Sequence, residues 1–359
     1  MNKREHIFLD VLRIIACFFV IYNHTSNQGF FLFAQYPIGS TKFFMYMPLS
    51  ICCKVAVPLF LMISGALLLN KEEPIRNLWV KRILRMVVVL VVCSFLYYLA
   101  EVYYDGKPLD IMLFVLIAYI SEWNFSFWYL YAYLAFLITL PFLRAMVQKL
   151  DNVHFYYMIG LALIFDAVIP IMQDFLFQEQ YMLNGNLTVS WLTNNIVLYP
   201  CIGYFLMHHV DIEKIKQKLP ALWGLNIGLI ILSCFLTYKQ SAATGECLEA
   251  DCQTYFSSFV LVNGITLFMT AKYFFSRKDW STYLKKIVSS IGECTFGMYL
   301  LHVFVLMRLE KPKAFFEWML NTAHIDPMVA VLVYCLLVMG ICYGVIWCVK
   351  KVPGVRRVV

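Results

Sequence analysis

The sequence predicts an all-α integral membrane protein, a single domain over residues 1–359 that crosses the bilayer about ten times. Hydrophobic residues make up 62% of the chain and charged residues only 14%, whereas soluble domains are nearer half apolar and a quarter charged. Apolar runs of spanning length also recur along the whole chain. We therefore expect a multi-pass protein of the plasma membrane. Its net charge of +7 then belongs to cytoplasmic loops and lipid headgroups, not to a nucleic-acid surface.

Ten runs are long and apolar enough to cross hydrocarbon. They lie near residues 7–27, 50–70, 86–104, 126–145, 154–172, 190–208, 220–238, 255–275, 288–307 and 328–349. An eleventh run at 111–120 is too short to span and predicts a re-entrant or interfacial helix.

Loop charges give the orientation. With both termini in the cytoplasm, the inner segments hold 21 of the 29 lysines and arginines, which is the excess that the positive-inside rule expects. The loop that carries Cys247 and Cys252 then lies outside the cytoplasm. That location favours a disulfide between them. A zinc site needs more ligands than this loop offers, and we expect no metal.

Three ionisable residues interrupt the first run: Asp10, Arg13 and His24. Such residues are rare in hydrocarbon unless they are paired or functional. The ten residues between Arg13 and His24 separate them by about 16 Å on a helix, so they approach opposite faces of the bilayer. A chemical pathway across the membrane has this arrangement. An arginine that snorkels to the headgroups and a histidine at the far interface also have it.

The second run is followed by a basic stretch that contains Lys81, Arg82 and Arg85. Arg82 and Arg85 share a helix face because they are three residues apart. Guanidinium groups match the oxygens of phosphate, so the stretch is a candidate phosphate site. Ordinary anchoring at the inner face of the membrane is the alternative.

Candidate residues also gather toward the outer face. Trp128 opens the run at 126–145, where an aromatic belt or a platform for a sugar ring is expected. Tyr299 and His302 share a face of the run at 288–307. His302 is either a hydrogen-bonded core residue or a partner of His24 in proton transfer. Asp166 either orients one of the histidines or borders a water cavity.

Several stretches resemble the acyltransferase family 3 of integral membrane proteins, in the order in which that family carries them. The first is LDVLRIIACFFVIYNH, in which ten residues separate an arginine from a histidine. It is followed by VAVPLFLMISGALLL, KRILR, SFWYLYAYL, YPCIGYFLMHH and TFGMYLLHVFVL. Together these stretches cover nearly the whole chain, in a form that consists of the membrane domain alone.

The resemblance implies an acyl-coenzyme A-dependent O-acyltransferase, most often one that moves acetyl to a hydroxyl of a cell-surface or lipid-linked carbohydrate. The donor, acetyl-CoA, is expected to enter from the cytoplasm. Lys81, Arg82 and Arg85 are then expected to hold its phosphates, and Arg13 to guide its pantetheine arm toward the catalytic group.

The same resemblance implies roles at the other end of the molecule. His24 is expected to act as general base on the acceptor hydroxyl or to carry the acyl group itself. His302 assists proton transfer or orients the substrate, while Trp128 and Tyr299 line the acyl tunnel. The sequence leaves the acceptor, the acyl length and the oligomeric state open.

A transporter or flippase for a glycan or acyl compound is the competing hypothesis. In it, Arg13, His24 and Asp166 form a proton-linked pathway. Coenzyme A binding through Arg82 and Arg85 separates the two hypotheses, because a transporter has no need of it.

Overall fold

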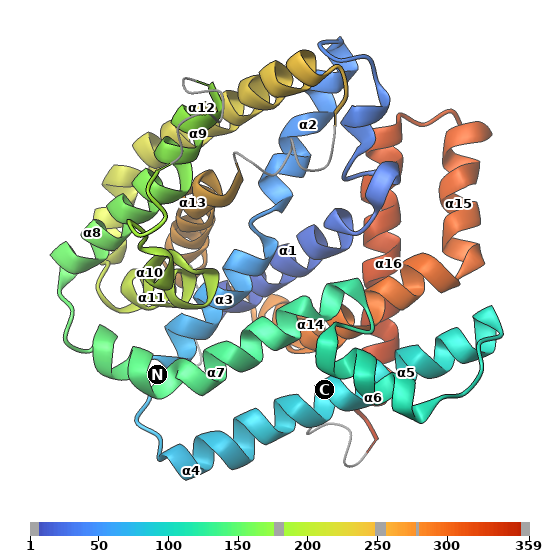
Figure 1. Ribbon diagram of the computed structural model, residues 1–359, viewed down its shortest axis with the longest axis horizontal. Coiled ribbons are helices and arrows are strands. Elements are labelled where there is room, and N and C mark those ends of the chain that lie inside the picture. The colour runs from blue at the N-terminus through green and yellow to red at the C-terminus, as the bar shows by residue number, and fades with distance from the viewer. Residues whose placement is uncertain (1–6, 176–182, 248–255, 278–279, 353–359) are drawn as a thin grey trace.

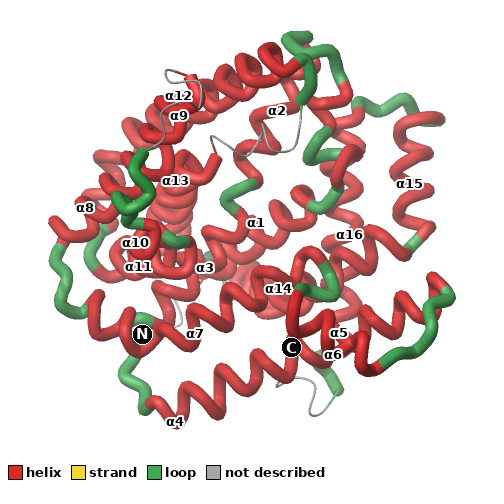
Figure 2. Tube along the Cα trace, viewed as in Figure 1, coloured by secondary structure: helices red, strands yellow, loops and turns green. Residues whose placement is uncertain are grey.

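Every regular element of the protein is a helix in the computed structural model, which describes residues 7–175, 183–247, 256–277 and 280–352 (Figure 2). The predicted all-α fold is confirmed. The α-helices of this part of the chain are α1 (Ile7–Asn23), α2 (Thr41–Cys53), α3 (Ala56–Leu68), α4 (Ile75–Leu78), α5 (Leu84–Asp105), α6 (Ile111–Ile120), α7 (Trp128–Val147), α8 (Asn152–Leu163), α9 (Ile169–Phe175), α10 (Ser190–Thr193), α11 (Asn195–His208), α12 (Ile212–Thr244), α13 (Phe256–Arg277), α14 (Thr282–Arg308), α15 (Glu310–Asn321) and α16 (Pro327–Val349).

The predicted apolar runs all fall on helices. Within the described residues, eight helical stretches are long and apolar enough to cross a membrane. The runs at 7–27 and 190–208 fall on shorter helices, α1 with 17 residues and α11 with 14. The short run at 111–120 forms α6, a helix of ten residues, as predicted. Cys252 lies outside the described residues, so the disulfide with Cys247 stays a prediction.

Helix α1 lies within the bundle and contacts α2, α3, α13, α14 and α16 (Figure 1). It lies close to α14 where Asp10 faces Gly292, since a Cβ atom on this glycine would stand 2.7 Å from the Cβ of Asp10. The glycine therefore lets the two backbones approach. As a result, α1 carries Arg13 and delivers His24, the residue after its last turn, into the interior of the protein.

Helices α3 and α11 cross with their backbones in direct contact. A Cβ on Gly65 would collide with the carbonyl group of Pro200, and a Cβ on Gly203 would collide with that of Met62. Small residues at such crossings allow tight packing in a membrane. This crossing fixes α3, which forms a wall of both cavities described below.

Candidate functional site

Tyr299 lines two cavities of the bundle. The first, which we call the basic cavity, has a volume of about 300 Å³ and contains Arg13, Arg82 and Arg85. The second, the histidine cavity, has a volume of about 810 Å³ and contains His24. Helices α1, α3, α7 and α14 contribute residues to both. The two cavities therefore lie on either side of a shared wall at Tyr299.

The basic cavity collects the cations that the sequence singled out. Arg13, Lys81, Arg82 and Arg85 all line it, beside aromatic rings from α3, α7 and α14. Lys81 and Arg82 lie in a π-helical segment, Trp79–Ile83, between α4 and α5. A π turn is wider than an α turn and is frequent at functional sites. Here it lets consecutive cations face the same space, which regular helical spacing does not predict.

Glu73 holds two arginines, of which Arg82 lines the basic cavity. Its Oε2 atom accepts a hydrogen bond from Nε of Arg82 at 2.9 Å and one from Nη2 of Arg144 at 3.3 Å. Arg144 is buried, and its Nε donates to the carbonyl of Leu68 at 3.0 Å. Partial burial raises the pKa of Glu73, but the two arginines outweigh burial and leave this pKa below its usual value. The ionised carboxylate therefore orients Arg82 at neutral pH.

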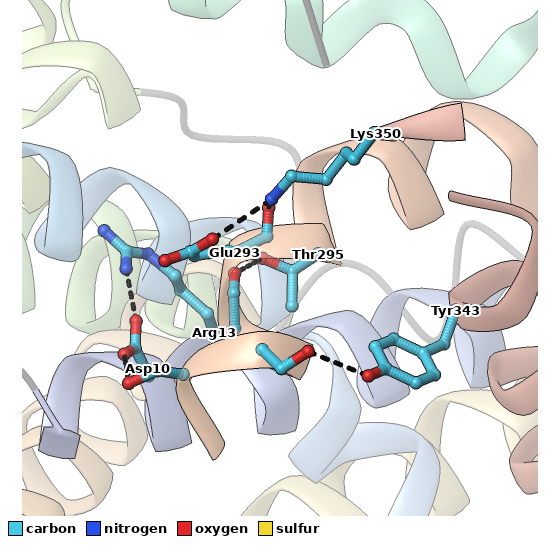
Figure 3. A network of polar contacts seen from close by, with 9 residues as sticks. Asp10, Arg13, Glu293, Thr295, Tyr343 and Lys350 are labelled. Carbon is cyan, nitrogen blue, oxygen red and sulfur yellow. Dashed lines mark hydrogen bonds and ion pairs between the residues drawn. The ribbon is translucent and has the colours of Figure 1, made fainter. Parts of the chain in front are cut away.

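Arg13 is oriented in a similar way by Asp10. Its Nη1 lies 2.6 Å from Oδ1 of Asp10, whose other oxygen accepts a hydrogen bond from Ser289 at 3.1 Å. Nearby, Lys350 of the segment after α16 reaches Glu293 of α14 at 3.2 Å (Figure 3). These contacts tie α1, α14 and the end of α16 together. They fix the direction of the Arg13 side chain, which the sequence did not indicate.

The histidine cavity is built on a direct contact between the two predicted histidines. Nδ1 of His24 lies 2.6 Å from Nε2 of His302. Their rings stack with centroids 4.9 Å apart, and the Phe125 ring meets His24 edge-on at 5.0 Å. His24 lines the cavity, whereas His302 is fully buried behind it. The pair joins residues that are 278 positions apart in the chain.

The hydrogen bonds around this pair assign its protons. Nδ1 of His302 lies 2.5 Å from the carbonyl oxygen of Tyr299, so this nitrogen carries a proton and donates it. In a neutral imidazole the other nitrogen is then an acceptor. Nε2 of His302 therefore accepts from Nδ1–H of His24, and Nε2 of His24 is left as an unprotonated base. A buried partner thus fixes the tautomer of the histidine that faces the cavity.

Tyr97 of α5 contacts the turn of α14 that carries His302. Its hydroxyl donates to the carbonyl of Leu300 at 3.0 Å and accepts from the amide of Phe304, also at 3.0 Å. Tyr97 therefore links α5 to the turn of α14 that carries His302.

Three further predicted residues are placed as follows. Tyr299 donates its hydroxyl to the carbonyl of Ser126, which anchors the shared wall. Trp128 lines the histidine cavity and not the basic cavity. Asp166 accepts a hydrogen bond from Thr193 at 3.3 Å and lines neither cavity. The pathway of Arg13, His24 and Asp166 that a transporter would use is therefore not assembled around the two cavities.

Four residues that hold the predicted site residues in place were not predicted from the sequence. They are Glu73, Tyr97, Ser126 and Asp10, the last as the partner of Arg13. Asp10 was noticeable as an acid in an apolar run. The others look like an ordinary loop acid, an interior tyrosine and a loop serine, and only the tertiary structure gives them partners.

Comparison with known proteins adds one match. The acyltransferase family 3 model, described as an acyltransferase domain, matches residues 6–347, nearly the whole chain. No curated protein and no solved structure matches the chain.

Proposed function

The chain belongs to the acyltransferase 3 family and is a multi-pass membrane acyltransferase, and we propose that it moves an acetyl group from acetyl-CoA to a carbohydrate hydroxyl. The observation that carries the proposal is the pair of adjoining cavities, one lined by four cations and the other by a neutral histidine base, with Tyr299 in both. Such a pair suits two substrates that enter from opposite sides, one into each cavity.

The basic cavity is the proposed donor site. Lys81, Arg82 and Arg85 bind the phosphates of acetyl-CoA, since cations at this spacing match phosphate oxygens. Arg13 lies deeper along α1 and contacts the pantetheine arm. The aromatic rings of this cavity confine the arm and direct the thioester toward Tyr299. The excess of loop cations on this side supports a cytoplasmic location for this end, where acyl-CoA is found.

The histidine cavity is the proposed acceptor site. Nε2 of His24 takes the proton of the acceptor hydroxyl as its oxygen attacks the thioester carbonyl. The carbon–sulfur bond breaks, and the proton passes to the departing thiolate. His302 holds the tautomer of His24 that makes this possible. Trp128 offers a ring face on which a sugar can stack. The acceptor is a cell-surface or lipid-linked carbohydrate, presented on the outer side of the bilayer.

Reconstitution in liposomes with radiolabelled acetyl-CoA tests the proposal. We expect His24→Ala to lower the rate of acetyl transfer about 10²- to 10⁴-fold, the usual contribution of a general base, while donor affinity stays unchanged. His154→Ala is the matched control, because His154 is exposed and lines neither cavity. Full transfer by His24→Ala would contradict the proposal.

The same preparation separates direct transfer from an acyl-histidine intermediate. We expect direct transfer, so labelled acetyl-CoA without acceptor should leave no acetyl group on the protein after rapid quenching. A labelled adduct at His24 would instead establish a ping-pong route.

A further inference from the structure

Three tyrosines line the basic cavity, and the hydroxyls of two of them are already bonded. The three are Tyr129 and Tyr133 of α7 and Tyr299 of α14. Tyr299 donates to the carbonyl of Ser126, and the hydroxyl of Tyr133 bonds to Ser64. The hydroxyl of Tyr129 makes no hydrogen bond to any residue that the structure describes. Tyr129 therefore keeps a donor that the protein itself does not use.

This donor belongs to a buried side chain. Tyr129 is only 6% exposed, and a buried hydroxyl without a partner costs free energy. Buried tyrosines therefore usually find an acceptor for this group. The hydroxyl of Tyr129 is not among the polar atoms that the protein both encloses and leaves without a hydrogen bond, so it reaches the space of the cavity. A ligand in the basic cavity can accept a hydrogen bond from it.

The position of Tyr129 indicates which part of a ligand it meets. Its ring lies edge-on to that of Tyr299, with centroids 5.4 Å apart. The Tyr299 ring in turn lies 5.6 Å from the ring of His302, the partner of His24. Trp128, the residue before Tyr129, lines the histidine cavity. Tyr129 thus stands on the donor side of the shared wall, where the thioester of the proposed donor arrives.

The proposed reaction needs a hydrogen-bond donor at this place. When the acceptor oxygen attacks the thioester, negative charge collects on the carbonyl oxygen until the carbon–sulfur bond breaks. Preorganised donors that stabilise such an oxyanion, tyrosine hydroxyls among them, supply a large part of the catalysis of acyl transfer. The mechanism proposed above uses the cations for the donor's phosphates and arm and the histidine pair for the proton. Neither group serves the carbonyl oxygen.

We propose that the hydroxyl of Tyr129 donates a hydrogen bond to the carbonyl oxygen of the acetyl thioester and to the oxyanion that forms from it, which makes Tyr129 a catalytic residue. The proposal rests on the acyltransferase function proposed above. The carbonyl oxygen gains an electron pair as the bond from the acceptor oxygen forms, and it returns this pair as the carbon–sulfur bond breaks. Tyr129 keeps its proton throughout, while His24 carries the proton of the acceptor to the departing thiolate.

Isotope-edited infrared spectroscopy measures this hydrogen bond without an acceptor substrate. The full chain in lipid nanodiscs is saturated with acetyl-CoA, either unlabelled or with ¹³C at the carbonyl, and the difference spectrum isolates the thioester carbonyl band. A hydrogen bond weakens the carbonyl double bond and lowers its stretching frequency. We expect the band of bound acetyl-CoA to lie at a lower frequency in wild type than in Tyr129→Phe. Affinity for acetyl-CoA should fall about fivefold at most, the contribution of one neutral hydrogen bond.

Tyr204→Phe is the matched control. Tyr204 of α11 is also 6% exposed, and its hydroxyl likewise has no hydrogen bond to a described residue, but it lines neither cavity. Its band should coincide with that of wild type. With glucose as the acceptor probe, Tyr129→Phe should lower the turnover rate at saturating acetyl-CoA about a hundredfold, the usual cost of removing one oxyanion donor. Tyr204→Phe should turn over as wild type.

A carbonyl band at the same frequency in wild type and Tyr129→Phe would overturn the proposal and leave the donor site intact. A band shift that Tyr204→Phe reproduces would overturn it as well, because the band would then report a general change in the protein. A wild-type turnover rate in Tyr129→Phe would refute the catalytic role. Absence of acetyl-CoA binding by well-folded wild type would instead refute the acyltransferase function on which the proposal rests.

Discussion

The side chains of the two cavities are held in place by different kinds of contact. In the basic cavity, Arg13 and Arg82 are each held by a carboxylate, Asp10 and Glu73. In the histidine cavity, His24 is held by a neutral hydrogen bond to His302. Fixed ion pairs suit a ligand whose charge is constant, such as a phosphate group. A neutral pair suits a step in which a proton must leave and return.

Under the proposed function, the difference assigns donor binding to one cavity and the chemical step to the other. Changes to the ion pairs of the basic cavity should alter donor affinity and leave the chemical step intact. Changes around the histidine pair should do the opposite. Tyr299 lines both cavities, so a change at this residue should alter both donor affinity and the chemical step. Each variant below removes one contact, either at the basic cavity or around the histidine pair.

Among three variants that each remove one supporting contact, the largest effect is expected from His302→Phe. Without an acceptor for its Nδ1 proton, His24 is free to adopt the other tautomer, which presents N–H instead of a lone pair to the cavity. We expect the turnover rate to fall about a hundredfold with unchanged affinity for acetyl-CoA. His302→Asn, which restores an acceptor oxygen, should recover part of the loss. A turnover rate within a factor of two of wild type in a well-folded His302→Phe protein would contradict the role of His302 in fixing the tautomer of His24.

A smaller effect, on donor affinity in the basic cavity, is expected from Glu73→Gln. The neutral amide holds Arg82 and the buried Arg144 less strongly, so donor affinity should fall about tenfold, which corresponds to the loss of one charge-assisted hydrogen bond. Calorimetric titration with acetyl-CoA measures it. Glu72→Gln is the control, since the neighbouring Glu72 is exposed and has no ion pair among the described residues. A lower turnover rate at saturating donor, with affinity kept, would contradict the division between the cavities.

The smallest effect is expected from Tyr97→Phe. Loss of the hydroxyl removes both hydrogen bonds that Tyr97 makes to the turn that carries His302. A net hydrogen bond is worth about 1 kcal/mol, so we expect a turnover rate about fivefold lower and an unchanged donor affinity. Tyr343→Phe is the control, because its hydroxyl also reaches α14, at Ser290 (2.8 Å), but not at the histidine pair. Equal effects of the two variants would reduce Tyr97 to a general packing role.

Much of the fold was predictable because a helix that crosses hydrocarbon needs a run of about 20 apolar residues. Apolar runs of spanning length found the helices, and a short run found α6. Boundaries were less well predicted: the run at 50–70 missed the start of the span at Thr41, because α2 contains polar residues and Pro48 and continues into α3 past the break at Lys54.

The site was predictable where its residues are close in sequence. Arg13 on α1 and His24 just after it line different cavities, and Lys81, Arg82 and Arg85 line the cavity of Arg13; the roles assigned to them stay predictions. Contacts between distant segments were not predictable in the same way. The approach of His302 to His24 spans 278 positions and that of Glu73 to Arg144 spans 71, and no local pattern encodes either one. Trp128 was assigned to the acyl tunnel with Tyr299, but adjacent residues of α7 divide between the cavities, so that Trp128 lines one and Tyr129 the other.

Calorimetric binding of acetyl-CoA to the purified, detergent-solubilised protein tests the central claim most directly, because the claim requires a coenzyme A site in the basic cavity. We expect specific binding by wild type, binding weakened about a hundredfold or more in Arg82→Ala/Arg85→Ala, and wild-type binding in Arg76→Ala, an exposed arginine outside both cavities. Absence of binding by well-folded wild type, or equal binding by the double variant, would contradict the claim and favour a transporter.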